Sequence, residues 1–137
     1  MKKLICCFLI LNLFAASSCS TGEKGPDPSP VINTMTAGTW RVTEYIVNGN
    51  IPVSDNYTGY SFTFGSDETV TATKDMNTYI GAWSVQNFDN DRLKFVISYD
   101  SPEAFTYLTN SWRIRFRSAN KITLDINEFN YVTFEKN

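Results

Sequence analysis

Residues 38–42 read Gly-Thr-Trp-Arg-Val, and residues 81–85 repeat the pattern as Gly-Ala-Trp-Ser-Val. A looser third copy, Asn-Ser-Trp-Arg-Ile, occupies residues 110–114. In each copy larger apolar residues alternate with polar or small ones, and successive side chains of a β-strand point to opposite faces. The motif therefore predicts three strands that each place a tryptophan on the buried face.

The same alternation extends outward from these motifs over most of the chain. From about residue 37 onward, aromatic and β-branched residues are dense, which is typical of strands. Polar turns such as Asn48-Gly49-Asn50 and Gly65-Ser66-Asp67 separate the runs. The pattern predicts one all-β domain over residues 37–137, an antiparallel up-and-down barrel of about eight strands. One short helical turn is expected within residues 101–108.

Alternation also predicts which side chains point into the barrel. In the first run, Trp40, Val42 and Ile46 are expected on the inner face, opposite Arg41, Thr43 and Tyr45. The complete set of aromatic residues expected to point inward is Trp40, Tyr60, Phe62, Phe64, Trp83, Phe95, Tyr99, Trp112 and Phe116.

The first 18 residues have the pattern of a secretory signal peptide. Lys2 and Lys3 precede an apolar run over residues 4–16, which ends in small residues. A transmembrane helix needs about 20 apolar residues, whereas this run is shorter and is interrupted by Asn12. We therefore expect residues 1–18 to be removed on export.

Residues 16–19, Ala-Ser-Ser-Cys, resemble the lipobox of bacterial lipoproteins. The resemblance implies cleavage before Cys19, attachment of acyl chains such as palmitate to it, and anchoring to a membrane. An ordinary signal peptide cut near Ser18 is the alternative. Cys6 and Cys7 would leave with the signal peptide, so an internal disulfide is excluded. In the lipoproteins that this segment resembles, an Asp after the cysteine often marks inner-membrane retention, so Ser20 at this position implies the outer membrane of a Gram-negative bacterium.

Residues 19–36 are expected to form a flexible tether between the anchor and the barrel. Three of the five prolines lie here, at Pro26, Pro28 and Pro30, among glycine and polar residues. Such a composition is typical of extended linkers.

The order of these motifs along the chain resembles that of two protein families. Gly38-Thr39-Trp40 is similar to the Gly-x-Trp signature of lipocalins, and residues 37–136 look like the small lipocalin-like domains of bacterial lipoproteins. The matching pieces are the strand and turn at residues 60–67, the second motif at 81–85 and the final Val132-Thr133-Phe134. The second resemblance is to META-type envelope domains, which also begin with Gly-Thr-Trp and an Asn-Gly turn.

The lipocalin resemblance implies a small apolar or amphipathic ligand inside the barrel. Tyr60 and Tyr99 could orient it through their hydroxyl groups. The candidate ligand-binding residues are Trp40, Tyr60, Phe62, Trp83, Phe95, Tyr99, Trp112 and Phe116. An eight-stranded barrel can equally be filled by its own side chains. In that case the domain would act through its outer face on a protein or glycan, including as an inhibitor or immunity protein.

Arg113, Arg115 and Arg117 are expected on the outer face of one strand, with Asp125 beside them on the next. They could form ordinary cross-strand ion pairs or an anion-binding patch for phosphate or sulfate groups. Residues 89–91, Asp-Asn-Asp, are interpreted as a polar turn, with a calcium site as the alternative.

Composition excludes several classes of function. The chain contains no histidine, so Ser/His and Cys/His nucleophile systems are absent and zinc lacks its usual nitrogen ligand. We expect no catalytic residues, no cofactor and no metal. The net charge is −2, or −4 without Lys2 and Lys3, which argues against nucleic-acid binding. We expect a monomer that contacts the membrane through Cys19.

Overall fold

The computed structural model describes residues 25–89 and 91–137. Its elements are α1 (Ser29–Thr36), β1 (Thr39–Val47), β2 (Ile51–Pro52), a 3-10 helix η1 (Ser54–Tyr57), β3 (Ser61–Phe64), β4 (Thr69–Lys74), β5 (Asn77–Asp89), β6 (Arg92–Ser98), α2 (Glu103–Thr106), β7 (Asn110–Arg117), β8 (Lys121–Asn127) and β9 (Asn130–Lys136). No helix in these two ranges is long and apolar enough to cross a membrane. The predicted signal peptide and Cys19 lie outside the described residues.

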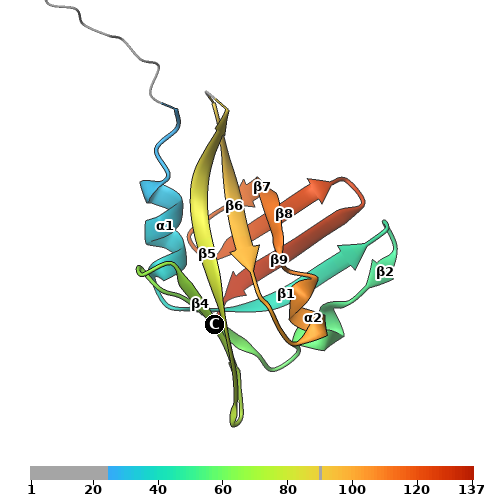
Figure 1. Ribbon diagram of the computed structural model, residues 1–137. Coiled ribbons are helices and arrows are strands. Elements are labelled where there is room, and N and C mark those ends of the chain that lie inside the picture. Colours follow the sequence, from blue (N-terminus) through green and yellow to red (C-terminus); the bar gives the residue numbers. More distant parts are fainter. Residues whose placement is uncertain (1–24, 90) are drawn as a thin grey trace, which may run out of the picture.

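Eight strands form a closed antiparallel barrel in chain order (Figure 1). From β3 to β9, consecutive strands pair with one another, and β9 returns to pair with β1. The start of β1 also pairs with β3, which completes the ring. The two-residue β2 pairs only with the end of β1. The predicted all-β up-and-down barrel is confirmed.

A bulge in β1 reverses the predicted orientation of the side chains beyond it. The pairing with β9 passes from Val42 to Glu44 and leaves Thr43 as the extra residue. An extra residue shifts the alternation by one position. Tyr45 is therefore buried and Ile46 only half-buried, so the prediction that Ile46 points inward and Tyr45 outward is wrong.

β7 contains a second bulge with the same effect. Its pairing with β8 passes from Ile114 to Phe116, and Arg115 is the extra residue. Phe116 consequently lies opposite Thr123 and is 50% exposed. The prediction that Phe116 points inward is wrong, because the sequence gives no sign of the bulge that precedes it.

α1 occupies the second half of the predicted tether. Val31 and Met35 are four residues apart, so they share one face of the helix, and both are buried. The indole Nε1 of Trp40 donates a hydrogen bond to the carbonyl of Met35 at 2.9 Å. The prediction of an extended, unpacked segment is therefore wrong for residues 29–36. Pro30 does not prevent the helix, because proline is tolerated in a first helical turn.

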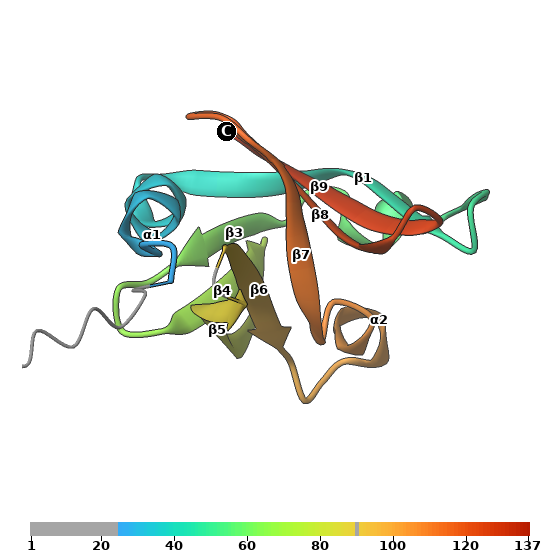
Figure 2. The same ribbon diagram turned by 90° about the horizontal axis from the view of Figure 1, so that it is seen from above.

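α2 lies at the opposite end of the barrel from α1 (Figure 2). Phe105 and Leu108 are buried there, and Trp112 Nε1 donates to the carbonyl of Leu108 at 2.9 Å. The predicted helical turn within residues 101–108 is confirmed. α1 sits where β1 begins, whereas α2 sits where β6 ends and β7 begins, so each helix packs on one end of the barrel.

Aromatic rings fill much of the space between the two helices. The ring of Phe64 lies 5.2, 5.7 and 5.8 Å from those of Trp83, Phe95 and Phe134, each in an edge-on arrangement. Such pairs add about 0.5–1.5 kcal/mol beyond the buried area alone. The barrel interior is therefore a packed core.

Candidate functional site

Most of the predicted ligand-binding side chains belong to this core. Trp40, Phe62, Trp83, Phe95, Tyr99 and Trp112 are buried, Tyr60 is half-buried and Phe116 is exposed. The buried members belong to one hydrophobic cluster, in which the rings of Trp83 and Phe95 lie 5.4 Å apart and those of Phe62 and Phe134 also lie 5.4 Å apart. Of the eight, Trp83 lines a surface pocket of about 100 Å³ and Phe116 lines one of about 270 Å³, both described below. The structure thus brings six of the eight together as packing residues.

Buried tyrosines at the α2 end act mainly as supports. The hydroxyl of Tyr45 donates to the carbonyl of Tyr107 at 2.7 Å, and that of Tyr57 donates to the carbonyl of Ala104 at 2.6 Å. Burial raises the pKa of Tyr45 to about 12 and raises that of Tyr57 further. These two hydroxyl groups therefore stay protonated and hold the chain around α2.

Tyr60 and Tyr99, the two predicted orienting tyrosines, differ from each other. The Tyr99 hydroxyl is buried and has no hydrogen-bond partner among the described residues, and burial raises its pKa. The pKa of Tyr60 is raised by desolvation and by the neighbouring hydroxyl of Tyr79. Both rings contact Phe105, at 5.1 Å each, so they pack under α2.

A pocket opens where β6 and β7 separate, at the α1 end of the barrel. The ladder between these strands runs from Ile97–Asn110 to Lys94–Arg113 and stops there. β6 continues to Arg92 and β7 to Arg117 without pairing to each other. A pocket of about 500 Å³ lies in this gap, and we call it the β6–β7 pocket.

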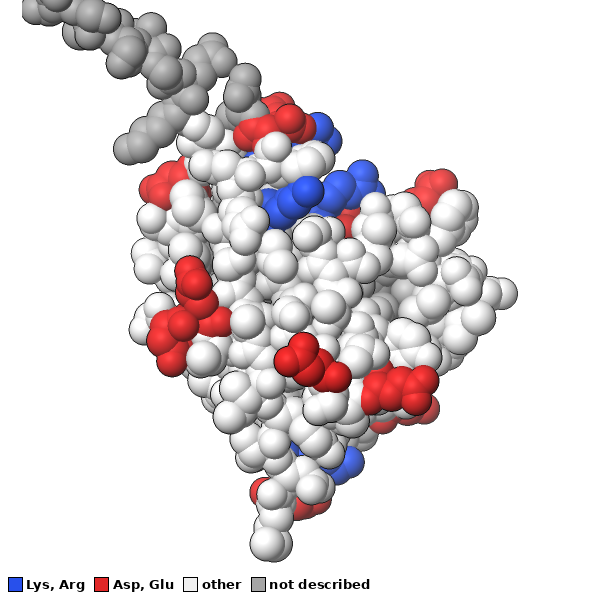
Figure 3. All heavy atoms as spheres, in the orientation of Figure 1, with Lys and Arg blue, Asp and Glu red and all other residues white. Residues whose placement is uncertain are grey.

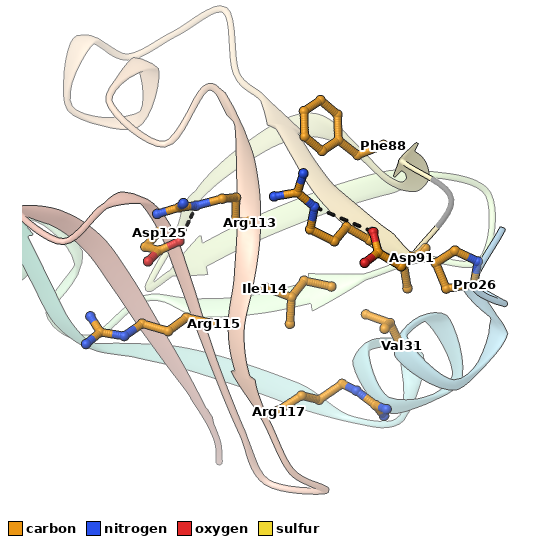
Figure 4. Close-up of a pocket in the computed structure, with 11 residues that line it drawn as sticks. Pro26, Val31, Phe88, Asp91, Arg113, Ile114, Arg115, Arg117 and Asp125 are labelled. Atoms are coloured by element: carbon orange, nitrogen blue, oxygen red, sulfur yellow. Dashed lines mark hydrogen bonds and ion pairs between the residues drawn. The ribbon is translucent and has the colours of Figure 1, made fainter.

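The β6–β7 pocket has an apolar floor and a charged rim (Figure 4). Val31 of α1 and Ile114 of β7 point toward one another across it, and Leu93 adds to the apolar lining. Pro26 and Phe88 lie at its edges. The charged lining residues are Arg92, Arg113, Arg115, Arg117, Asp91 and Asp125. Four guanidinium groups against two carboxylates give this rim a positive excess in a chain whose net charge is negative.

Two of the four arginines are neutralised by ion pairs. Arg113 Nε lies 3.0 Å from Asp125 Oδ1, which confirms the predicted cross-strand contact. Arg92 pairs with Asp89, and its Nε lies 3.8 Å from Asp91. Asp89 and Asp91 thus serve as partners of an arginine. In the two described ranges, no three His, Cys, Asp or Glu side chains converge to hold a metal ion.

Arg115 and Arg117 are not paired with a carboxylate in the described part of the chain. Arg115 lies over the ring of Tyr131, 5.8 Å from its centroid, and Arg117 donates to the carbonyl of Pro30 at 3.4 Å. The bulge at Arg115 also separates their directions, so the predicted single outward stripe is wrong. In the register with β8, Arg113 faces Asp125 whereas Arg117 faces the buried Ile122.

The space-filling view shows how the charges lie on one face. Most of the Lys and Arg side chains seen on this face lie toward the end of the molecule where the described chain begins, whereas acidic side chains are spread over the whole face (Figure 3). Two smaller pockets lie elsewhere. One of about 270 Å³ includes Glu44, Phe116 and Tyr131, and one of about 100 Å³ lies between Ile32 and Trp83.

The sequence interpretation missed the apolar half of the pocket. Val31 lies in the predicted tether and Ile114 in the third tryptophan motif, and neither of them, nor Leu93, is predicted from the sequence as a candidate site residue. The i, i+4 spacing of Val31 and Met35 was the one signal that could have revealed α1. Nothing in the sequence shows where β6 and β7 stop pairing.

The comparisons with known proteins support the fold. The structure is similar to a DUF4847 family protein from Bacteroides vulgatus, with a TM-score of 0.57 and 19% identity over 78% of this chain and 97% of the other. It is also similar to a lipocalin-like protein from Bacteroides uniformis, with a TM-score of 0.52 and 12% identity over 74% and 98%. The sequence matches no family model and no curated protein. Because these identities are low, the similarity supports only the fold, which is that of a lipocalin-like barrel.

Proposed function

We propose that this protein is a lipid-anchored envelope lipoprotein whose lipocalin-like domain binds one small amphipathic molecule in the β6–β7 pocket. The carrying observation is the separation of the two strands around about 500 Å³ of space with an apolar floor. Small-molecule sites usually measure about 300–1,000 Å³ and combine an apolar lining with a few polar groups. The pocket falls within this range of volume, and Val31, Leu93 and Ile114 give it an apolar floor below its charged rim.

The state of the barrel interior favours this lateral site. A ligand among Phe62, Phe95 and Trp112 would have to displace side chains that are at most 1% exposed. Close-packed interiors resist such insertion, because overpacking costs about 1–3 kcal/mol or more. The β6–β7 pocket requires no such displacement.

The anchor half of the proposal rests on Cys19 and on the position of α1. Cys19 and Ser29 are ten positions apart along the chain, which limits the distance between them to about 35 Å. A lipid on Cys19 would therefore keep the α1 end of the barrel, with its pocket, close to the bilayer surface.

Cys19→Ala is expected to abolish membrane association. Without the thiol no acyl chain can be attached, and each buried methylene of such a chain contributes about 0.8 kcal/mol to anchoring. Fractionation of cells that express the full chain, followed by detection in membrane and soluble fractions, measures the effect. Cys7→Ala is the matched control and should remain with the membranes. A Cys19→Ala protein that still sediments with membranes would contradict the anchor.

Ile114→Trp is expected to weaken binding of the neutral fluorescent probe N-phenyl-1-naphthylamine about tenfold or more, because the indole occupies the pocket floor. A chain that starts at Ser20 keeps every described helix and strand, so it can be titrated without lipid. Ile80→Trp adds the same group to the outside of β5, where Ile80 is 68% exposed, and should bind like the parent. Equal binding by both variants would contradict the pocket assignment.

A second candidate function follows from the filled core. The packed aromatic interior favours this second function, and the absence of probe binding by the parent chain would support it. The domain would then act through its outer face on a protein or glycan partner, including as an inhibitor or immunity protein.

A further inference from the structure

The charges around the β6–β7 pocket carry an inference about the chemistry of its ligand. Four arginines line it, but Arg92 and Arg113 are already neutralised by aspartates. The described residues provide no ion-pairing carboxylate for Arg115 or Arg117, so the charges of these two arginines are not compensated locally. A site with an apolar floor and unpaired guanidinium groups is complementary to a molecule with an apolar body and an anionic group.

The two unpaired arginines have different positions. In Figure 4, the side chain of Arg115 runs away from Val31, and it also borders the neighbouring pocket on the outer face. The side chain of Arg117 runs toward α1, whose Val31 forms part of the apolar floor. Among the described residues, Arg117 has one hydrogen bond, a long one of 3.4 Å to the Pro30 carbonyl. A guanidinium group has five N–H donors, so Arg117 retains donors for a ligand beside the floor.

We propose that the β6–β7 pocket selects amphipathic anions, with Arg117 binding the carboxylate, sulfate or phosphate group and Val31, Leu93 and Ile114 contacting the apolar part. The inference deepens the proposed function and rests on it. Arginine suits this role because its planar fork can bind two oxygens of one anion. Arg115 contributes a weaker, longer-range attraction from the rim.

A matched pair of probes separates charge from apolar contact. 1-Anilinonaphthalene-8-sulfonate and N-phenyl-1-naphthylamine share one aromatic body and differ only in the sulfonate. The parent chain should bind the sulfonate about tenfold more tightly than the neutral probe, which corresponds to about 1.4 kcal/mol. Added salt should weaken the sulfonate complex and leave the neutral one unchanged, because screening acts on the charge.

Substitutions then test the assigned residue. Arg117→Gln should weaken sulfonate binding about tenfold and leave neutral-probe binding unchanged. Arg115→Gln should weaken it by less than about threefold. Arg41→Gln, which changes an arginine that lines none of the three pockets, is the control and should bind like the parent. Arg117→Glu should abolish sulfonate binding and keep neutral-probe binding, which shows that the pocket is still formed.

Two further arms identify the source of the anion. Dodecanoate, with dodecanol as the uncharged control, tests a free amphiphile through displacement of the sulfonate probe. Sedimentation with phosphatidylglycerol vesicles, against phosphatidylcholine vesicles, tests a lipid headgroup. Binding in either arm that depends on Arg117 supports the inference. Inorganic phosphate alone should displace little probe, because it lacks the apolar part.

The outcomes distinguish the proposed binding in the β6–β7 pocket from the proposed selection of anions. If neither probe binds the parent chain, the proposed function is wrong. If the neutral probe binds as tightly as the sulfonate, or if Arg117→Gln weakens both equally, the proposed function survives and the anion selectivity is overturned.

Discussion

Replacing Trp112 with alanine is expected to lower the free energy of unfolding by about 3–5 kcal/mol, whereas Phe116→Ala should lower it by less than about 1 kcal/mol. Trp112 is fully buried, and its Nε1 donates to the Leu108 carbonyl, so truncation leaves a cavity and an unpaired acceptor. Phe116 lies beyond the β7 bulge and is half exposed. Regular alternation would place Trp112 and Phe116 on the same face of β7, yet their losses of unfolding free energy should differ several-fold.

Urea denaturation of the two variants and the parent measures this difference. Since both substitutions remove a large side chain from one strand, each serves as the control for the other. Similar losses of stability would contradict the bulge and restore the regular alternation that the sequence predicts. If Trp112→Ala does not fold, Trp112→Phe provides a milder comparison with the same expected order.

Raising the pH from about 10 to 12 is expected to remove several kcal/mol of stability. Tyr45 has an ordinary pKa of 10.0 and a folded pKa of about 12, and burial also raises the pKa of Tyr57 and Tyr99. Below pH 10 all three are protonated in both states, so stability is fully present. Above pH 10 the unfolded chain releases protons that the folded chain retains, and stability falls. Tyr45 alone accounts for about 2 kcal/mol of this loss.

Tyr99→Phe provides the sharpest control for the alkaline effect. The Tyr99 hydroxyl has no described partner, so its removal sacrifices no hydrogen bond and should leave stability at pH 7 unchanged or higher by about 1 kcal/mol. The fall in stability above pH 10 should become shallower in this variant. Denaturation midpoints from pH 7 to 12 measure both effects. An identical pH dependence in parent and variant would contradict the burial of that hydroxyl.

The barrel itself could be predicted from the sequence because its determinants are local. Alternation around Trp40, Trp83 and Trp112, with short polar turns between the runs, specifies strands, one buried face and neighbouring connections. Burial of these three tryptophans and closure of the ring agree with that pattern. The single helical turn before β7 could also be predicted.

The errors share a physical cause. A bulge is decided by pairing with a neighbouring strand, so the extra residues Thr43 and Arg115 carry no local mark. The β6–β7 pocket depends on where a ladder ends and on how α1 packs, both of which are tertiary effects. The three prolines around the start of α1 indicate an extended linker, although the i, i+4 spacing of Val31 and Met35 is typical of a helix. Alternation predicts one face for Arg113, Arg115 and Arg117, but the bulge at Arg115 sets the directions in which they point.

The most direct test of the lateral pocket is a ¹H–¹⁵N NMR titration of the chain from Ser20 onward with N-phenyl-1-naphthylamine. The largest chemical-shift changes should fall on the backbone amides of Val31, Leu93 and Ile114, and the amides of the aromatic core should barely move. Changes centred on Phe62, Phe95 and Tyr99 would place the ligand inside the barrel and contradict the β6–β7 pocket as the binding site.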